Sequence, residues 1–213
     1  MNKKTDERPP QRIRRRNLLN LAPALALGAV IAVSGIAAVA ASCLAGPVTR
    51  NHLAGSRSAY LQRASAQPVD WYPWGDEAWR RAKELDRPVL LDVGAIWCSW
   101  CNLMDRESYL QPDMAAFINQ NFVAIKVDFD ADPKFSAKLE RAQAFLNLPA
   151  GLPLTGFLTP TGTLYSGGGY FPAKAEGEKP AFRTELEAAL KIYRNNRAQI
   201  EKEGFKVISG ETK

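Results

Sequence analysis

The sequence predicts an α/β domain in which helices flank a mixed central sheet, behind a hydrophobic N-terminal segment. Two apolar strand patterns alternate with amphipathic helix patterns, and a hairpin pattern and a long closing helix follow them. Such an alternation favours a sheet covered by helices. Hydrophobic residues make up 46% of the 213 residues, enough to bury a core and to exclude a wholly disordered chain.

The first half of the domain is predicted to alternate helix and strand. Asp76 is expected to cap a helix that carries its apolar residues on one face and ends at residue 87, before Pro88. The mostly apolar run 89–94 is typical of a buried strand. Two further helices are expected at 98–106 and 112–120.

The second half is predicted to add a central strand, a helix, a hairpin with its turn at Thr161-Gly162, and a closing helix. The strand ranges are 122–127, 154–158 and 163–166, and the helix ranges are 134–146 and 180–202.

Most of the net charge of +6 lies at the start of the chain. Residues 1–16 hold seven basic and two acidic side chains, and residues 17–49 hold no charged side chain at all. The near-neutral remainder argues against a nucleic-acid partner. An uncharged apolar segment of this length can span a bilayer, and the preceding positive charge favours a cytoplasmic N-terminus.

The predicted organisation is therefore a basic head, an anchor, a tether, a domain and a tail. The ranges are 1–16, 17–45, 46–67, 68–205 and 206–213. A retained anchor is favoured because the apolar stretch exceeds an ordinary signal-peptide core. Export with cleavage near Ala38-Val39-Ala40, twin-arginine export through Arg15-Arg16, and lipidation at Cys43 remain open.

The sequence Trp97-Cys98-Ser99-Trp100-Cys101 carries the strongest chemical signal. It follows a predicted strand and opens a predicted helix, where free N–H groups and the helix dipole favour a thiolate. Cys98 is then the nucleophile and Cys101 the resolving thiol. Half of a zinc site and a purely structural disulfide are the alternatives, the latter closing a very short loop.

The segment from Leu91 to Cys101 resembles the active site of thioredoxin-fold proteins, in the Trp before the first Cys and in Asp92 six residues ahead of it. The resemblance implies that Asp92 is buried behind the pair and accepts the proton of the resolving thiol. A strand-end carboxylate with only a local hydrogen bond is the alternative. Pro153 matches the cis-proline of this fold. A cis peptide bond there would present the backbone of Leu152 to a substrate. The alternative is that Pro153 is an ordinary loop proline.

A closer resemblance covers residues 51–172. It is to the thioredoxin-like domain of the YyaL and spermatogenesis-associated family, and the segment around the cysteines is also similar to DsbD-type periplasmic domains. Those relatives usually carry His where this chain has Ser99 and Asn102, and longer members continue into an α-barrel. Five blocks carry the match: 51–54, 68–75, 121–123, 158–160 and 170–172.

The expected function is thiol–disulfide exchange with protein thiols and disulfides outside the cytoplasm, on the periplasmic side of the membrane. Trp97, Trp100, Leu152 and Pro153 are the expected substrate-binding residues. No cofactor or metal is expected. Asp92 favours the reductase direction, which requires an electron donor, and a membrane protein is the expected donor. A partner-binding module without catalysis is the alternative. The aromatic residues within 71–79 either line the floor of a substrate groove or pack in the core.

Overall fold

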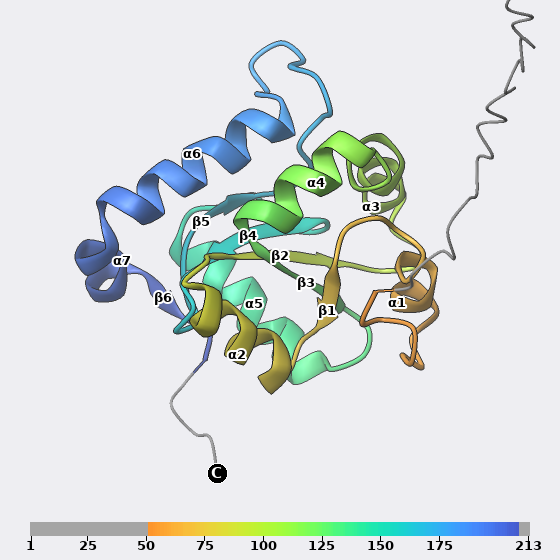
Figure 1. The fold of residues 1–213 in the computed structure, drawn as a ribbon, viewed down its shortest axis with the longest axis horizontal. Coiled ribbons are helices and arrows are strands. Elements are labelled where there is room, and N and C mark those ends of the chain that lie inside the picture. The colour runs from red at the N-terminus through yellow and green to blue at the C-terminus, as the bar shows by residue number, and fades with distance from the viewer. Residues whose placement is uncertain (1–50, 209–213) are drawn as a thin grey trace, which may run out of the picture. The chain divides into compact units, whose positions relative to one another are not determined.

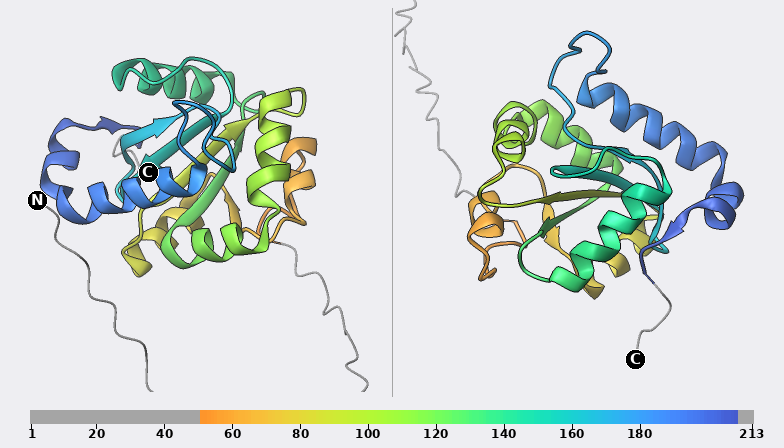
Figure 2. Two further views of the ribbon diagram at one scale, coloured as in Figure 1. Left: turned by 90° about the horizontal axis from the view of Figure 1, so that it is seen from above. Right: turned by 180° about the vertical axis from the view of Figure 1, so that it is seen from behind.

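The computed structural model describes residues 51–208, which form one mixed sheet covered by helices on both faces (Figures 1 and 2). The strand order among these residues is β1-β3-β2-β4-β5-β6. β2 is parallel to β3 and antiparallel to β4, so the predicted mixed sheet is confirmed. The strand bounds are Trp71–Pro73, Val89–Gly94, Val123–Asp128, Leu154–Leu158, Thr163–Gly168 and Phe205–Lys206 for β1 to β6.

The helices divide between the two faces of the sheet. Leu90 points to the face covered by α1, α3, α4 and α6, whereas Leu91 points to the face covered by α2 and α5, because neighbouring strand residues alternate between faces. The helix bounds are Ala59–Ala64, Asp76–Leu85, Ser99–Met104, Pro112–Asn121, Pro133–Phe145, Phe182–Asn195 and Arg197–Glu203 for α1 to α7.

Local chemistry accounts for several helix starts. Asp132 caps α5 through its carboxylate, which accepts from the backbone N–H groups of Lys134 and Phe135, and Pro133 occupies the first turn. The expectation that Asp76 caps α2 is wrong. Asp76 is the first helical residue, and Gly75 stands at the cap without a side-chain hydrogen bond.

The predicted helix over 98–106 has two parts. α3 ends at Met104, and a π-helical turn, Asp105–Tyr109, continues it. The aromatic segment also contributes more structure than expected, because β1 lies within it as an edge strand beside β3. Trp71, Tyr72 and Trp79 are buried, so these three rings belong to the core.

The predicted tether and tail need correction within the described residues. Residues 51–67 are part of the domain: α1 lies there, Leu53 and Tyr60 are buried, and the Asn51 amide donates to the carbonyls of Ala64 and Val69 at 2.9 and 3.0 Å. Among the described residues of the predicted tether, Ser58 caps the start of α1 and Ser65 stands at its end. At the other end, β6 includes Lys206, and Val207 is buried.

None of the helices within residues 51–208 has the length and apolarity needed to cross a membrane. The segment 17–45, for which an anchor is expected, lies outside the described residues, as does Cys43. The anchor therefore stays a prediction.

Candidate redox site

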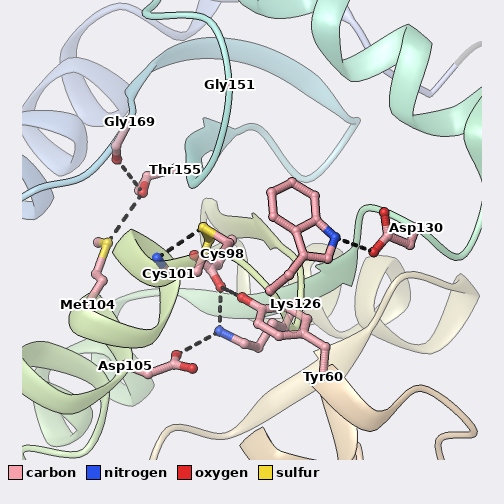
Figure 3. Close-up of a disulfide and its surroundings, with 12 residues drawn as sticks. Tyr60, Cys98, Cys101, Met104, Asp105, Lys126, Asp130, Gly151, Thr155 and Gly169 are labelled. Atoms are coloured by element: carbon pink, nitrogen blue, oxygen red, sulfur yellow. Dashed lines mark hydrogen bonds and ion pairs between the residues drawn. A yellow bond between two sulfur atoms is a disulfide. The ribbon is translucent and has the colours of Figure 1, made fainter.

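Cys98 and Cys101 form a disulfide between the end of β2 and the first turn of α3 (Figure 3). Their Cα atoms are 5.3 Å apart. Cys98 is the N-cap residue of α3, and its sulfur accepts a hydrogen bond from the backbone N–H of Cys101 at 3.1 Å. This N–H would stabilise negative charge on the Cys98 sulfur after reduction. Among residues 51–208, no group of three metal-ligating side chains is placed to hold a metal ion.

Two indole rings stand exposed beside the disulfide. Trp97 is 64% exposed and Trp100 52%, and exposed side chains of this size commonly mark a contact surface. The Trp97 indole N–H donates to Asp130 at 2.8 Å, and the Trp100 ring lies 4.9 Å from the ring of Tyr170. Each indole is thus held in place while it keeps an open face.

A groove of about 360 Å³ adjoins the disulfide. The Leu152–Pro153 peptide bond is cis, which confirms that expectation, and Leu152 lines the groove. The sequence-predicted residues Cys98, Trp97, Trp100 and Leu152 are therefore brought together, whereas Pro153 is not among the lining residues. Other lining residues are Ser99, Phe129, Glu140, Gln143 and Gly151.

A buried group of charges lies beneath the groove. We define the charged cluster as Asp92, Lys126, Asp105, Tyr60 and Tyr109. The ammonium of Lys126, with no exposed surface, pairs with the Asp92 carboxylate and with Asp105 at 3.0 Å. Tyr60 donates to Oδ2 of Asp92 at 3.1 Å and Tyr109 to Oδ1 at 3.4 Å. The expected burial of Asp92 is confirmed, since it is 1% exposed.

Burial and mutual charge set the protonation of this cluster. Burial raises the pKa of Asp92, and the positive charge of Lys126 opposes that rise. Burial alone would lower the pKa of Lys126, but the carboxylates of Asp92 and Asp105 outweigh it, so that pKa is raised. Burial, followed by the charge of Asp92, raises the pKa of both tyrosines well above the usual value. The lysine thus stays charged and the tyrosines stay neutral.

The charged cluster reaches the disulfide at Gly94. A Cβ placed on Gly94 would lie less than 3.0 Å from both the Tyr60 hydroxyl oxygen and the Cys101 sulfur. The two atoms therefore share one small space on the inner side of β2. Asp92 points to the same side, two residues earlier on the strand.

Sequence reasoning missed four members of the charged cluster, namely Lys126, Tyr60, Asp105 and Tyr109. Lys126 offered a signal, because a lysine inside an apolar strand pattern requires a buried counter-charge. Tyr60 offered none, since it lies in the segment expected to be a tether, and nothing in the local sequence marks Asp105 or Tyr109 as a partner of Asp92 or Lys126.

Comparison with known proteins identifies relatives of this chain. The family model Thioredox_DsbH, described as a protein of unknown function, DUF255, matches residues 50–210. Spermatogenesis-associated protein 20 of Rattus norvegicus is 34% identical over 149 residues, or 70% of this chain and 19% of that protein. The uncharacterized protein B0495.5 of Caenorhabditis elegans is 33% identical over 159 residues, or 75% of this chain and 22% of that protein. The chain spans about a fifth of the length of these relatives.

Solved structures with a similar backbone include a DsbH oxidoreductase, with a TM-score of 0.44 and 21% identity over 58% of this chain and 85% of that chain. A thioredoxin from Thermus thermophilus gives a TM-score of 0.42 and 21% identity, covering 60% of this chain and 88% of that one.

Proposed function

The chain belongs to the Thioredox_DsbH family, and from this premise we propose that Cys98 and Cys101 catalyse thiol–disulfide exchange with protein substrates. The resemblance to the thioredoxin-like domain of the spermatogenesis-associated family is borne out by the identity with those relatives. The observation that carries the proposal is the Cys98–Cys101 disulfide at the start of α3, beside an open groove.

The proposed reaction moves two electrons from the cysteine pair to a substrate disulfide. The Cys98 thiolate attacks one substrate sulfur, so that a mixed disulfide forms and the first substrate thiolate leaves. The Cys101 thiolate then attacks Cys98, which releases the second substrate thiolate and closes the Cys98–Cys101 disulfide. A dithiol donor must reduce the pair before another turn, and we propose that a membrane protein supplies these electrons.

The reductase direction is favoured because Asp92 provides a proton acceptor behind the pair. A carboxyl group whose pKa is raised by burial matches the task of taking a thiol proton near neutral pH. Oxidation of substrate thiols is the same sequence of steps in reverse.

Substrates are proposed to bind across the groove. The exposed indoles of Trp97 and Trp100 would pack against apolar substrate side chains, and the backbone of Leu152, next to Pro153, would hydrogen-bond an extended substrate segment. A partner bound in this way places its disulfide next to Cys98.

The proposed location of the domain is outside the cytoplasm, with residues 17–45 as a membrane anchor or, alternatively, a cleaved export signal. The support is the basic head followed by 33 uncharged residues. A reporter fused after residue 46 tests this: activity only of a periplasm-dependent reporter is expected, and activity only of a cytoplasm-dependent one refutes it.

Insulin reduction in the presence of dithiothreitol tests the chemistry. The full-length protein should accelerate it, and Cys98→Ser should abolish the acceleration. Ser166→Ala, which leaves both thiols and lies on β5 outside the groove lining, is the matched control and should retain it. Cys101→Ala should trap substrates as mixed disulfides on Cys98. No acceleration by the wild type, together with no trapped partners, would refute the proposal.

That outcome would favour a second candidate, a partner-binding module without catalysis. The specific observation behind it is the pair of exposed indoles, which suit a protein contact whether or not the cysteines react.

A further inference from the structure

We propose that the hydroxyl of Tyr60 is a catalytic proton carrier between the thiol of Cys101 and the carboxylate of Asp92. The inference rests on the proposed exchange function and assigns a residue to its resolving step. Tyr60 comes from α1, far from the cysteine pair in the sequence.

The first argument is position. Both the Tyr60 hydroxyl oxygen and the Cys101 sulfur lie less than 3.0 Å from the point where a Cβ of Gly94 would sit. The oxygen and the sulfur are therefore at most about 5 Å apart. Figure 3 shows Tyr60 and Lys126 together on one side of the cysteine pair.

The second argument is connection. The same hydroxyl donates to Oδ2 of Asp92 at 3.1 Å, the oxygen that also pairs with Lys126. One tyrosine oxygen thus lies within about 5 Å of the sulfur that must lose a proton, and it bonds the carboxylate that can take the proton. A hydroxyl can donate one proton while it accepts another, which a carboxylate or an ammonium at this place could not do.

The third argument is that the hydroxyl is held there. Tyr60 is buried, and the ammonium of Lys126 lies 4.9 Å from its ring centroid. Gly94 leaves the required space, because any larger residue would collide with the ring and with Cys101. The Tyr60 side chain is therefore held where the transfer requires it.

The proton balance of the step is complete. As Cys101 attacks the mixed disulfide on Cys98, its thiol proton passes to the Tyr60 oxygen and the phenolic proton of Tyr60 passes to Asp92. The Cys101–Cys98 bond forms, the bond from Cys98 to substrate breaks, and the substrate leaves as a thiolate. Burial keeps Tyr60 neutral in the resting protein, and the proton that it receives from Cys101 replaces the one that it gives to Asp92.

The test separates the two chemical steps with Ellman's reagent, an aromatic disulfide. Attack by Cys98 releases one coloured thiolate, and resolution by Cys101 releases a second. In Tyr60→Phe full-length protein we expect an unchanged first phase and a second phase slowed about 100-fold at pH 7, the lower end of the usual range for acid–base assistance. The rate of the second phase should also rise with pH more steeply than in the wild type, as hydroxide replaces the relay.

Tyr109→Phe is the matched control. It removes one hydroxyl from the same carboxylate, but from Oδ1 and not from the side shared with Cys101. We expect a clearly smaller slowing of the second phase. Equal second phases in Tyr60→Phe and wild type, or equal slowing in the two tyrosine variants, would overturn the relay.

Two further measurements keep the proposal falsifiable. If Tyr60→Phe does not fold, Asp92→Asn must show the slow second phase, and a normal second phase in Asp92→Asn would overturn the relay. Where both variants fold, the double variant should be no slower than the slower of the two single variants. A wild type that shows both phases with Ellman's reagent but reduces no protein disulfide would refute the proposed function while leaving the relay chemistry testable on its own.

Discussion

Removing the Lys126 charge is the most informative perturbation of the charged cluster. Lys126→Met retains an unbranched side chain of similar length, so packing is largely kept while the ammonium is lost. Two buried carboxylates then lose their shared partner. Asp105 keeps Arg63 at 3.4 Å, whereas Asp92 keeps only the two tyrosine hydroxyls.

The expected loss of unfolding free energy is about 3–5 kcal/mol at pH 8, the usual range when one partner of a buried ion pair is removed. The ammonium also lies over three aromatic rings, at 4.8 to 5.0 Å from their centroids. Cation–π contacts contribute up to about 2 kcal/mol when desolvated, so their loss acts in the same direction.

The loss of unfolding free energy in Lys126→Met should depend on pH, and the pKa of Asp92 determines the direction. Without Lys126, nothing opposes the burial that raises the pKa of Asp92, so its folded pKa rises further above its unfolded value. A carboxyl with a raised folded pKa favours folding at low pH, and that contribution disappears as the pH rises through the folded pKa. The difference between wild type and Lys126→Met should therefore be smallest near pH 4 and largest at pH 8.

Urea denaturation of the full-length protein at pH 4.5, 6 and 8 measures this. Asp92→Asn combined with Lys126→Met is the matched variant, because it removes the unpaired charge and should recover much of the loss at pH 8. An equal loss at all three pH values, or no recovery in the double variant, would refute the electrostatic account.

The remaining predictions concern Glu201 and Gly94. Although burial raises it, the pKa of Glu201 is lowered from 4.5 to about 2 by hydrogen bonds from Lys206 and neighbouring threonines. Its contribution to stability is thus present above about pH 4.5 and lost as the pH falls toward 2. Glu201→Gln should therefore lower the thermal midpoint at pH 7, and by progressively less below pH 4.5. A difference in thermal midpoint that stays constant with pH would contradict this. Gly94→Ala should lower the unfolding free energy, measured by urea denaturation, by about 1–3 kcal/mol through overpacking against Tyr60. Adding Tyr60→Phe should recover part of this loss. Wild-type stability in Gly94→Ala would show that the space beside Gly94 is not restrictive.

The fold was predictable where the signal is local. β2 spans 89–94, as its apolar run predicts, and the expected hairpin is β4 and β5. The N-terminal boundary of the domain was not predictable, because the turn and cap residues around α1 have the same composition as a linker. Only contacts with distant residues, such as the Ser58 hydroxyl donating to Asp128 at 2.5 Å, distinguish the two.

The candidate site divides in the same way. The cysteine pair and Asp92 follow from short-range spacing and resemblance. The partners of Asp92 do not, since Tyr60 lies 32 residues before it and Lys126 34 residues after it. A sequence can signal that a buried charge needs a partner, but the sheet register decides which one: β2 pairs with β3 so that Asp92 faces Lys126.

The two sides of the disulfide are therefore expected to control different properties. The outer side carries exposed indoles and the groove, and its substitutions should change which substrates react with Cys98. The inner side carries the buried charged cluster, and its substitutions should change the pH dependence of Cys101. Trp100→Ala and Tyr60→Phe should accordingly act independently. Their effects on the second phase of the reaction with Ellman's reagent should multiply, because the two side chains act on opposite sides of the pair.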